Sequence, residues 1–206
     1  MSIKYPDGSS YNNENSSDRL NNSTSNKETI FGDRGMTLEQ EINQSNIYYR
    51  THDIAVIYKK PIPLQIVKVD YPKRSKAVIR EAYFRQPSTT DYNGIYRGKY
   101  IDFEAKETRH KTMFPFTNFH EHQIEHLRKC LKLGGICFVI IRFVTLNEYY
   151  VLPASVLIKH WDLQNTKDGK KSLSHQLIVE NAYSIEPSFN PTLPYLSACD
   201  KMMSTS

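Results

Sequence analysis

The sequence predicts an α/β fold, with a central mixed β-sheet flanked by helices and a basic hairpin inserted between the early strands. Three features support this class. Residues 99–106 alternate between apolar and polar side chains, residues 136–143 form a continuous apolar run typical of a central strand, and residues 35–49 and 119–133 place apolar side chains at helical spacing. With 206 residues, the chain is long enough for one domain with a sizeable core.

Two helices are predicted to flank this sheet. The first, at 35–49, has one stripe of side chains at helical spacing, formed by Leu38, Ile42, Ser45 and Tyr49. The second, at 119–133, has Asn118 as its expected N-cap, Glu121 three residues later, and Gly134 and Gly135 at its end. Segments 149–152 and 153–161 are predicted to add a short strand and a third helix.

The strand at 99–106 carries a row of charged side chains on one face. Because side chains alternate across a strand, Asp102, Glu104 and Lys106 point to the same side of the sheet, and the apolar residues between them face the core. A two-residue turn at 97–98 precedes this strand, so the segment that carries Asp91 folds back beside it. We therefore expect Asp91 to lie next to Glu104 and Lys106.

This grouping suits a metal-dependent nuclease. Magnesium prefers hard oxygen ligands, which Asp91, Glu104 and the backbone carbonyl of Ala105 can supply. Lys106 lies on the same face, where an ammonium can orient the attacking water or stabilise negative charge in the transition state. The alternative is an ordinary surface strand whose Glu–Lys ion pair contributes only about 0–1 kcal/mol to stability.

Positive charge is concentrated between residues 59 and 85. This segment has eight basic residues and two acidic ones, a net charge of +6, whereas the whole chain has +5, so the remainder sums to −1. Two apolar runs, 64–69 and 77–84, flank a basic stretch at 71–75 and predict a long hairpin with a cationic tip, although 75–85 could equally begin as a helix. The candidate DNA contacts are Lys73, Arg74 and Lys76 at the tip, Tyr83 and Phe84 near the base, and Lys59 and Lys60 as phosphate anchors. An ordinary basic loop is the simpler alternative.

Several strings of residues in order resemble one known family. They are Lys59-Lys60-Pro61, Tyr71-Pro72-Lys73-Arg74-Ser75, Ser88-Thr89-Thr90-Asp91-Tyr92-Asn93-Gly94 and Tyr100-Ile101-Asp102-Phe103-Glu104-Ala105-Lys106-Glu107-Thr108. From about residue 35 to the final helix, the chain resembles the RecU-type Holliday junction resolvases of the PD-(D/E)xK nuclease superfamily. Thr90 stands where the name of the motif has proline.

The resemblance implies a restriction-endonuclease-like core with a protruding stalk at about 62–85. It implies a Mg²⁺-dependent endonuclease, with Mn²⁺ as a substitute, that resolves four-way DNA junctions by paired symmetric nicks leaving 5′-phosphate ends. A homodimer and a link to the RecA recombinase are also implied. The implied metal-site residues are Asp91, Glu104, Thr89, Gln123 and Glu39, and Gln123 joins Asp91, Glu104 and Lys106 as a catalytic residue.

Other possibilities remain open at this level. Glu41 is expected to be a solvated helix carboxylate, and Glu39 is open to the same interpretation. His120, His122 and His126 suggest zinc, but the zincin pattern is absent and no third ligand is evident. A junction-binding protein without catalysis, or a nuclease acting on linear duplex, would share part of the pattern.

The remaining expectations concern the tail and the location. Residues 1–30 contain Ser or Asn at 13 positions and predict a disordered tail. The sequence has no apolar run as long as a membrane span and no signal-peptide pattern, and its three cysteines are odd in number. We therefore expect a cytoplasmic, nucleoid-associated protein with reduced thiols.

Overall fold

The centre of the protein is a six-stranded mixed sheet. The structure, a computed structural model, describes residues 36–70, 77–84 and 89–204. The strand order is β1-β4-β5-β7-β8-β10, with β5 and β7 parallel and the other neighbours antiparallel. The bounds are Ala55–Lys59 for β1, Tyr92–Tyr96 for β4, Lys99–Thr108 for β5, Ile136–Phe143 for β7, Glu148–Pro153 for β8 and Tyr183–Ile185 for β10.

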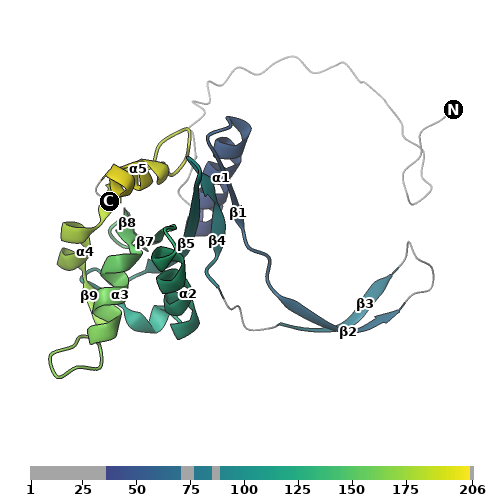
Figure 1. Cartoon of the computed structure of the whole chain (residues 1–206), viewed down its shortest axis with the longest axis horizontal. Coiled ribbons are helices and arrows are strands. Elements are labelled where there is room, and N and C mark those ends of the chain that lie inside the picture. Colours follow the sequence, from purple (N-terminus) through teal and green to yellow (C-terminus); the bar gives the residue numbers. More distant parts are fainter. Residues whose placement is uncertain (1–35, 71–76, 85–88, 205–206) are drawn as a thin grey trace, which may run out of the picture. The chain divides into compact units, whose positions relative to one another are not determined.

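Helices cover both faces of this sheet (Figure 1). Helices α1 (Leu38–Thr51) and α5 (Leu196–Ser204) contribute to one hydrophobic core. Helices α2 (Glu121–Lys132), α3 (Ala154–Leu163) and α4 (His175–Asn181) contribute to the core on the other face. The predicted α/β class, a central mixed sheet flanked by helices, is confirmed. Within the described ranges, no helix is both long enough and apolar enough to cross a membrane.

Strand β5 shows the predicted alternation. Ile101 and Phe103 are fully buried in the core beneath α1, whereas Asp102 and Glu104 face the other way and contact residues of α2. The Phe103 ring is stacked between those of Tyr92 on β4 and Phe138 on β7, at centroid distances of 4.8 and 4.7 Å and nearly parallel. This stack ties three neighbouring strands together directly beside Asp91, which precedes Tyr92, and Glu104, which follows Phe103.

The turn between β4 and β5 has the predicted form. Arg97 and Gly98 have φ values of 48° and 73°, as a two-residue hairpin turn with two left-handed positions requires. Gly94 in β4 allows β1 to approach closely, because a Cβ at this position would overlap the Val56 carbonyl oxygen and the Ile57 Cα. The hairpin therefore fixes the register that brings the start of β4 to the middle of β5.

The N-terminus of α2 differs from the prediction. Residues Phe116–Asn118 form a short 3₁₀ helix, so Asn118 is not the N-cap. The cap is His120, and the Gln123 side chain accepts a hydrogen bond from the His120 backbone N–H at 3.1 Å. Burial of Phe119 after the 3₁₀ turn moves the helix start along the chain. The predicted end is confirmed, since Gly134 has a φ of 85° and Gly135 N–H donates to the Cys130 carbonyl.

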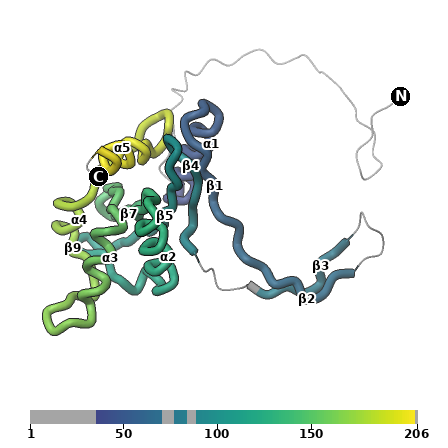
Figure 2. The backbone as a smooth tube through the Cα atoms, viewed as in Figure 1, coloured from purple at the N-terminus to yellow at the C-terminus, as the bar shows by residue number. Residues whose placement is uncertain are grey.

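Two smaller sheets complete the described chain. Strands β2 (Leu64–Asp70) and β3 (Val78–Phe84) pair antiparallel as a separate hairpin, so the strand interpretation of this segment holds over the helical one (Figure 2). Strands β6 (Met113–Pro115) and β9 (Ser172–Ser174) form the other pair. The predicted tail at 1–30 and the basic tip residues Lys73, Arg74 and Lys76 lie outside the described residues.

Candidate active site

Asp91 and Glu104 meet where the pairing of β4 with β5 ends. The register of these strands ends at Tyr92 opposite Phe103, so Asp91 and Glu104 are the next residues on either side. The Asp91 backbone N–H donates a hydrogen bond to Oε2 of Glu104 at 3.1 Å. Two acidic residues that are 13 positions apart in the sequence thus come together, as the hairpin predicted.

Lys106 and Gln123 reach the same carboxylate. The Nζ atom of Lys106 lies 2.8 Å from Oε1 of Glu104, and the amide nitrogen of Gln123 donates to that oxygen, also at 2.8 Å. Glu104 is fully buried and Gln123 nearly so. Strand β5 supplies Glu104 and Lys106 from one face, and the first turn of α2 supplies Gln123. The structure therefore brings Asp91, Glu104, Lys106 and Gln123 into one group.

The protonation of Glu104 reflects this environment. Burial is the main cause that raises the pKa of Glu104 to about 7, and the nearby Asp91 carboxylate adds to the shift. Lys106 acts in the opposite direction, because its ammonium favours the charged carboxylate. Near neutral pH the side chain thus holds a proton part of the time, and a second positive charge would be needed to keep it fully ionised.

This shift predicts that divalent metal binding depends on pH. A cation that binds Glu104 must displace its proton, so affinity for Mn²⁺ should rise about tenfold per pH unit below pH ~7 and level off above it. Calorimetric titration between pH 5.5 and 8 measures this. Without metal, stability should depend on pH in the opposite direction. Because the pKa of Glu104 is higher in the folded than in the unfolded protein, the free energy of unfolding should fall as pH rises from about 4.5 to 7. Glu104→Gln is the control, and a parent affinity that does not change with pH would contradict the assignment.

A small cavity of about 260 Å³ opens beside Asp91. Its lining includes Glu39 from α1 and, from β5, Ala105 and Glu107. Glu39 is more than half exposed and forms an ion pair with Lys59, with Nζ and Oε2 2.5 Å apart. The structure thus places Glu39 and Lys59 at the rim near Asp91. Sequence reasoning missed Glu107, because alternation assigns it to the face opposite Glu104.

Glu41 corrects an expectation. It is buried rather than solvated, accepts a hydrogen bond from the Tyr149 hydroxyl at 2.9 Å, and lies 3.7 Å from the Arg142 guanidinium. These partners lie about a hundred residues further along the chain, so local spacing could not reveal them. Of the two helix carboxylates, it is Glu39 that lines the cavity with Asp91.

Asp102 is the centre of a second polar cluster that sequence reasoning did not find. Its Oδ2 atom lies 2.8 Å from Nζ of Lys60 and 3.0 Å from Nε2 of His126, and it accepts a hydrogen bond from the Tyr100 hydroxyl at 2.6 Å. The Thr90 hydroxyl donates to Oδ1. Lys60 is therefore directed toward this cluster, and its role as a phosphate anchor stays a prediction. The signal in the sequence was an aspartate two residues before Glu104, on the same face of the strand.

Asp102, His126 and Cys130 also have the grouping of metal ligands, since their donor atoms lie within 4.8 Å of one another. The Lys60 ammonium already compensates the carboxylate charge, so the cluster is explained without a metal. His120 and His122 stack on each other at a centroid distance of 5.4 Å, while His126 contacts Asp102. The three histidines thus do not act as one set of ligands.

The other predicted residues are placed as follows. Thr89 is half-buried, and its hydroxyl donates a long hydrogen bond of 3.4 Å to the Thr90 carbonyl. Tyr83 on β3 is more than half exposed, and its hydroxyl donates to Glu81 at 2.6 Å. The Phe84 side chain, like the tip of the hairpin, lies outside what the structure describes.

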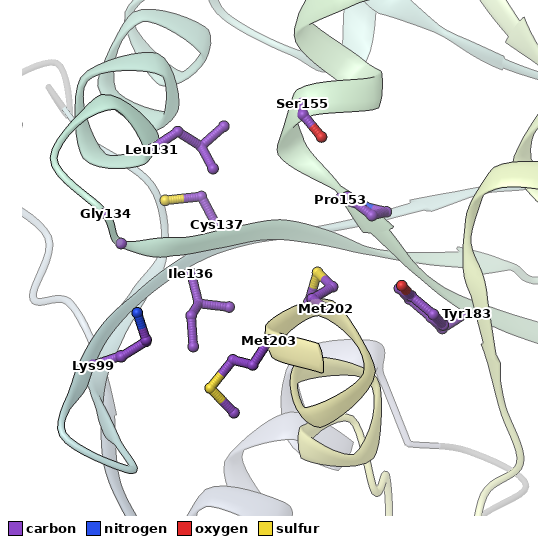
Figure 3. A pocket seen from close by; sticks show the side chains of 11 residues that line it. Lys99, Leu131, Gly134, Ile136, Cys137, Pro153, Ser155, Tyr183, Met202 and Met203 are labelled. Atoms are coloured by element: carbon purple, nitrogen blue, oxygen red, sulfur yellow. The ribbon is translucent and has the colours of Figure 1, made fainter. Parts of the chain in front are cut away.

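The larger cavity, about 470 Å³, lies at the start of β7 (Figure 3). The side chains around it are mostly apolar and include Leu131, Cys137, Tyr183, Met202 and Met203. It contains none of the predicted site residues.

Comparisons with known proteins agree with one another. The family model "RecU: Recombination protein U" matches residues 33–201. Relatives called Holliday junction resolvase RecU include those of Latilactobacillus sakei, 56% identical over 98% of this chain and 97% of the relative, and Lacticaseibacillus casei, 55% identical over 100% and 97%. A third, from Lactobacillus acidophilus, is 62% identical over 87% of this chain and 83% of its own.

Among solved structures, the chain is similar to Hjc, a Holliday junction resolvase of Archaeoglobus fulgidus. The TM-score is 0.42 at 7% identity, covering 71% of this chain and 94% of that one. The family match spans most of the sequence, and the relatives match over nearly their full length. The chain belongs to the recombination protein U (RecU) family.

Proposed function

We propose that this protein is a metal-dependent endonuclease that resolves four-way DNA junctions in recombination and repair. The observation that carries the proposal is the buried Glu104 carboxylate in contact with Asp91, Lys106 and Gln123, in a chain whose relatives are called Holliday junction resolvases. A junction-binding protein without catalysis would have no use for a buried, partly protonated carboxylate beside a second acidic residue.

The donor set fits a hard divalent cation. Asp91 and Glu104 are the proposed principal ligands, and Thr89, Gln123 and Glu39 are the proposed additional ones. Ala105 lines the same cavity as Asp91, so its backbone carbonyl is a proposed further ligand. Mg²⁺ is the proposed ion, with Mn²⁺ as a substitute. When bound, such an ion lowers the pKa of a coordinated water and neutralises charge on the phosphate.

Lys106 is the proposed partner of the reacting atoms. Its ammonium now contacts Glu104 and is about one-fifth exposed, so it borders the place where a phosphate would enter. From there it can orient a water molecule or stabilise charge that develops on the phosphate oxygens. Gln123 fixes the Glu104 oxygen from the opposite side through its amide nitrogen. The proposed products carry 5′-phosphate and 3′-hydroxyl ends.

Paired symmetric nicks require two active sites related by a two-fold axis, so we propose a homodimer. An exposed row of apolar side chains crosses the edge of the sheet and supports this: Val56, Ile95 and Tyr100 are direct neighbours on β1, β4 and β5. Val56 is 55% exposed and Ile95 58%. Sedimentation velocity tests the dimer, and a monomer at micromolar concentration would exclude it.

DNA recognition is proposed to depend mainly on junction shape. Lys59 and Lys60 are the proposed phosphate anchors, and Tyr83, Phe84 and the basic tip of the β2–β3 hairpin are the proposed junction contacts. The proposed setting is the cytoplasm at the nucleoid, with the RecA recombinase as an expected partner that a pull-down with purified protein would test.

The function is tested with a synthetic four-way junction and a linear duplex of matched sequence, each with and without Mg²⁺. We expect paired nicks in the junction only when Mg²⁺ is present, and little cleavage of the duplex. Binding of the junction without cleavage under both conditions would identify an architectural protein. Equal cleavage of both DNAs would identify a nuclease for linear duplex.

A further inference from the structure

The Asp102 carboxylate is a buried charged group with several side-chain partners. It is fully buried, and four side chains from different segments contact it: Lys60, Thr90, Tyr100 and His126. Lys60 also donates to the Thr90 hydroxyl at 2.9 Å, which closes the contacts into a network. We call Asp102, Lys60 and Thr90 the Asp102 clamp.

The clamp holds both ends of the hairpin insertion. Lys60 directly follows β1, where the chain leaves the central sheet for β2, and Thr90 lies where the chain returns from β3 to β4. The Lys60 backbone N–H also donates to the Asp91 carbonyl at 2.7 Å. Two segments 30 residues apart in sequence are thus fixed to each other and to the middle of β5.

Three residues of this network are close in sequence to residues of the proposed metal site. Thr90 directly precedes Asp91, and Asp102 precedes Glu104 by two positions on the same face of β5. His126 follows Gln123 by three positions, on the same side of α2. The network around Asp102 therefore parallels the group around Glu104. It is displaced by two residues along β5 and by about one turn along α2.

We propose that the Asp102 clamp is a positioning network that sets the distance between Asp91 and Glu104 for metal binding. The proposal rests on the metal-dependent function proposed above. Its physical basis is that a buried carboxylate must keep its donors, since a buried polar group without a partner is strongly destabilising. The clamp thus admits one arrangement of the segment that carries Asp91, and groups that hold ligands in place change metal affinity or activity by about 10–100-fold when removed.

The first test replaces Thr90. Thr90→Val keeps the shape and removes the hydroxyl that bonds Asp102, whereas Thr90→Ser keeps the hydroxyl. We expect Thr90→Val to weaken Mn²⁺ binding and to slow nicking at subsaturating metal, each about tenfold or more, with junction affinity in the absence of metal within twofold of the parent. Thr90→Ser should recover most of both losses. The matched control is Thr192→Val, because Thr192 is also buried and its hydroxyl hydrogen-bonds Gln44 at 3.0 Å, among residues that are not part of the site.

The second test concerns Lys60, for which two roles compete. The double variant Lys60→Met/Asp102→Asn removes the ion pair without leaving a buried charge unpaired, and Arg128→Met/Asp162→Asn, which removes an ion pair outside the site, serves as its control. A positioning role predicts weaker Mn²⁺ binding with an unchanged salt dependence of junction binding. A phosphate anchor predicts the reverse, with a salt slope smaller by about 0.7–0.9, and that result would overturn the role of Lys60 in the clamp.

The outcomes of these tests distinguish failure of the clamp proposal from failure of the proposed endonuclease function. If the parent does not nick junctions in any metal, the proposed function fails, while direct Mn²⁺ titration still measures the effect of the clamp. If the parent requires metal but Thr90→Val binds Mn²⁺ and nicks like the parent, the clamp has no positioning role. Equal losses in Thr90→Val and Thr192→Val would assign the effect to general stability and would also overturn the proposal.

Discussion

Replacing Asp91 or Glu104 with alanine is expected to lower the rate of junction cleavage by about a thousandfold or more, while junction binding survives. Both residues are proposed to hold the metal, and neither is proposed to recognise the shape of the DNA. Removing a negative charge near the phosphates should leave affinity unchanged or raise it. A gel-shift assay and a nicking assay on the same preparation measure the two effects.

Two further variants make this result specific. Glu104→Ala leaves the Lys106 ammonium without its carboxylate partner, so Glu104→Gln, which keeps the size of the side chain, separates loss of charge from loss of packing. Glu186→Ala removes an exposed carboxylate that follows β10, well outside the group around Glu104, and should retain activity. Junction binding lost in parallel with cleavage would count against the assignment of Asp91 and Glu104 as metal ligands.

Alanine at Lys73, Arg74 and Lys76 together is expected to weaken junction binding far more than duplex binding. The substitutions remove three positive charges from the predicted tip of the β2–β3 hairpin and leave β4 and β5 unchanged. If the tip lies among phosphates at the branch point, each lost contact should reduce the slope of log affinity against log salt by about 0.7–0.9. Salt titrations of both DNAs measure the effect.

A control variant with the same change in charge can be made just before β9. Lys167, Lys170 and Lys171 are exposed residues before β9, and replacing them with alanine also removes three positive charges. This control variant should keep the preference for junctions over duplex. Equal losses on the two DNAs in the hairpin variant would make the segment a general basic patch without a role in selecting structure.

Much of the site could be predicted because it depends on local rules. Strand alternation and a two-residue turn were enough to bring Asp91 beside Glu104 and Lys106, and the structure has that turn and that register. The assignment of Gln123 to the site came from family resemblance. The fold class followed from the same periodicities.

The rest depends on partners that are distant in sequence. Lys60 and Asp102 are 42 residues apart, and Tyr149 and Glu41 are 108 apart, so neither pair leaves a local pattern. Burial of these carboxylates could not be inferred without knowing which cations and hydroxyls meet them. The start of α2 was wrong for a related reason: burial of Phe119 decided it, although Asn118 is the better N-cap by residue type.

The stack of Tyr92, Phe103 and Phe138 has a thermodynamic consequence for the neighbouring carboxylates. It fixes the backbone directly beside Asp91 and Glu104, so these residues cannot move apart to relieve their repulsion. The site is locally frustrated, because well-packed surroundings hold two acidic residues side by side. A bound cation would relieve this repulsion, so the strain held in the free protein would add to the affinity of the proposed site for metal.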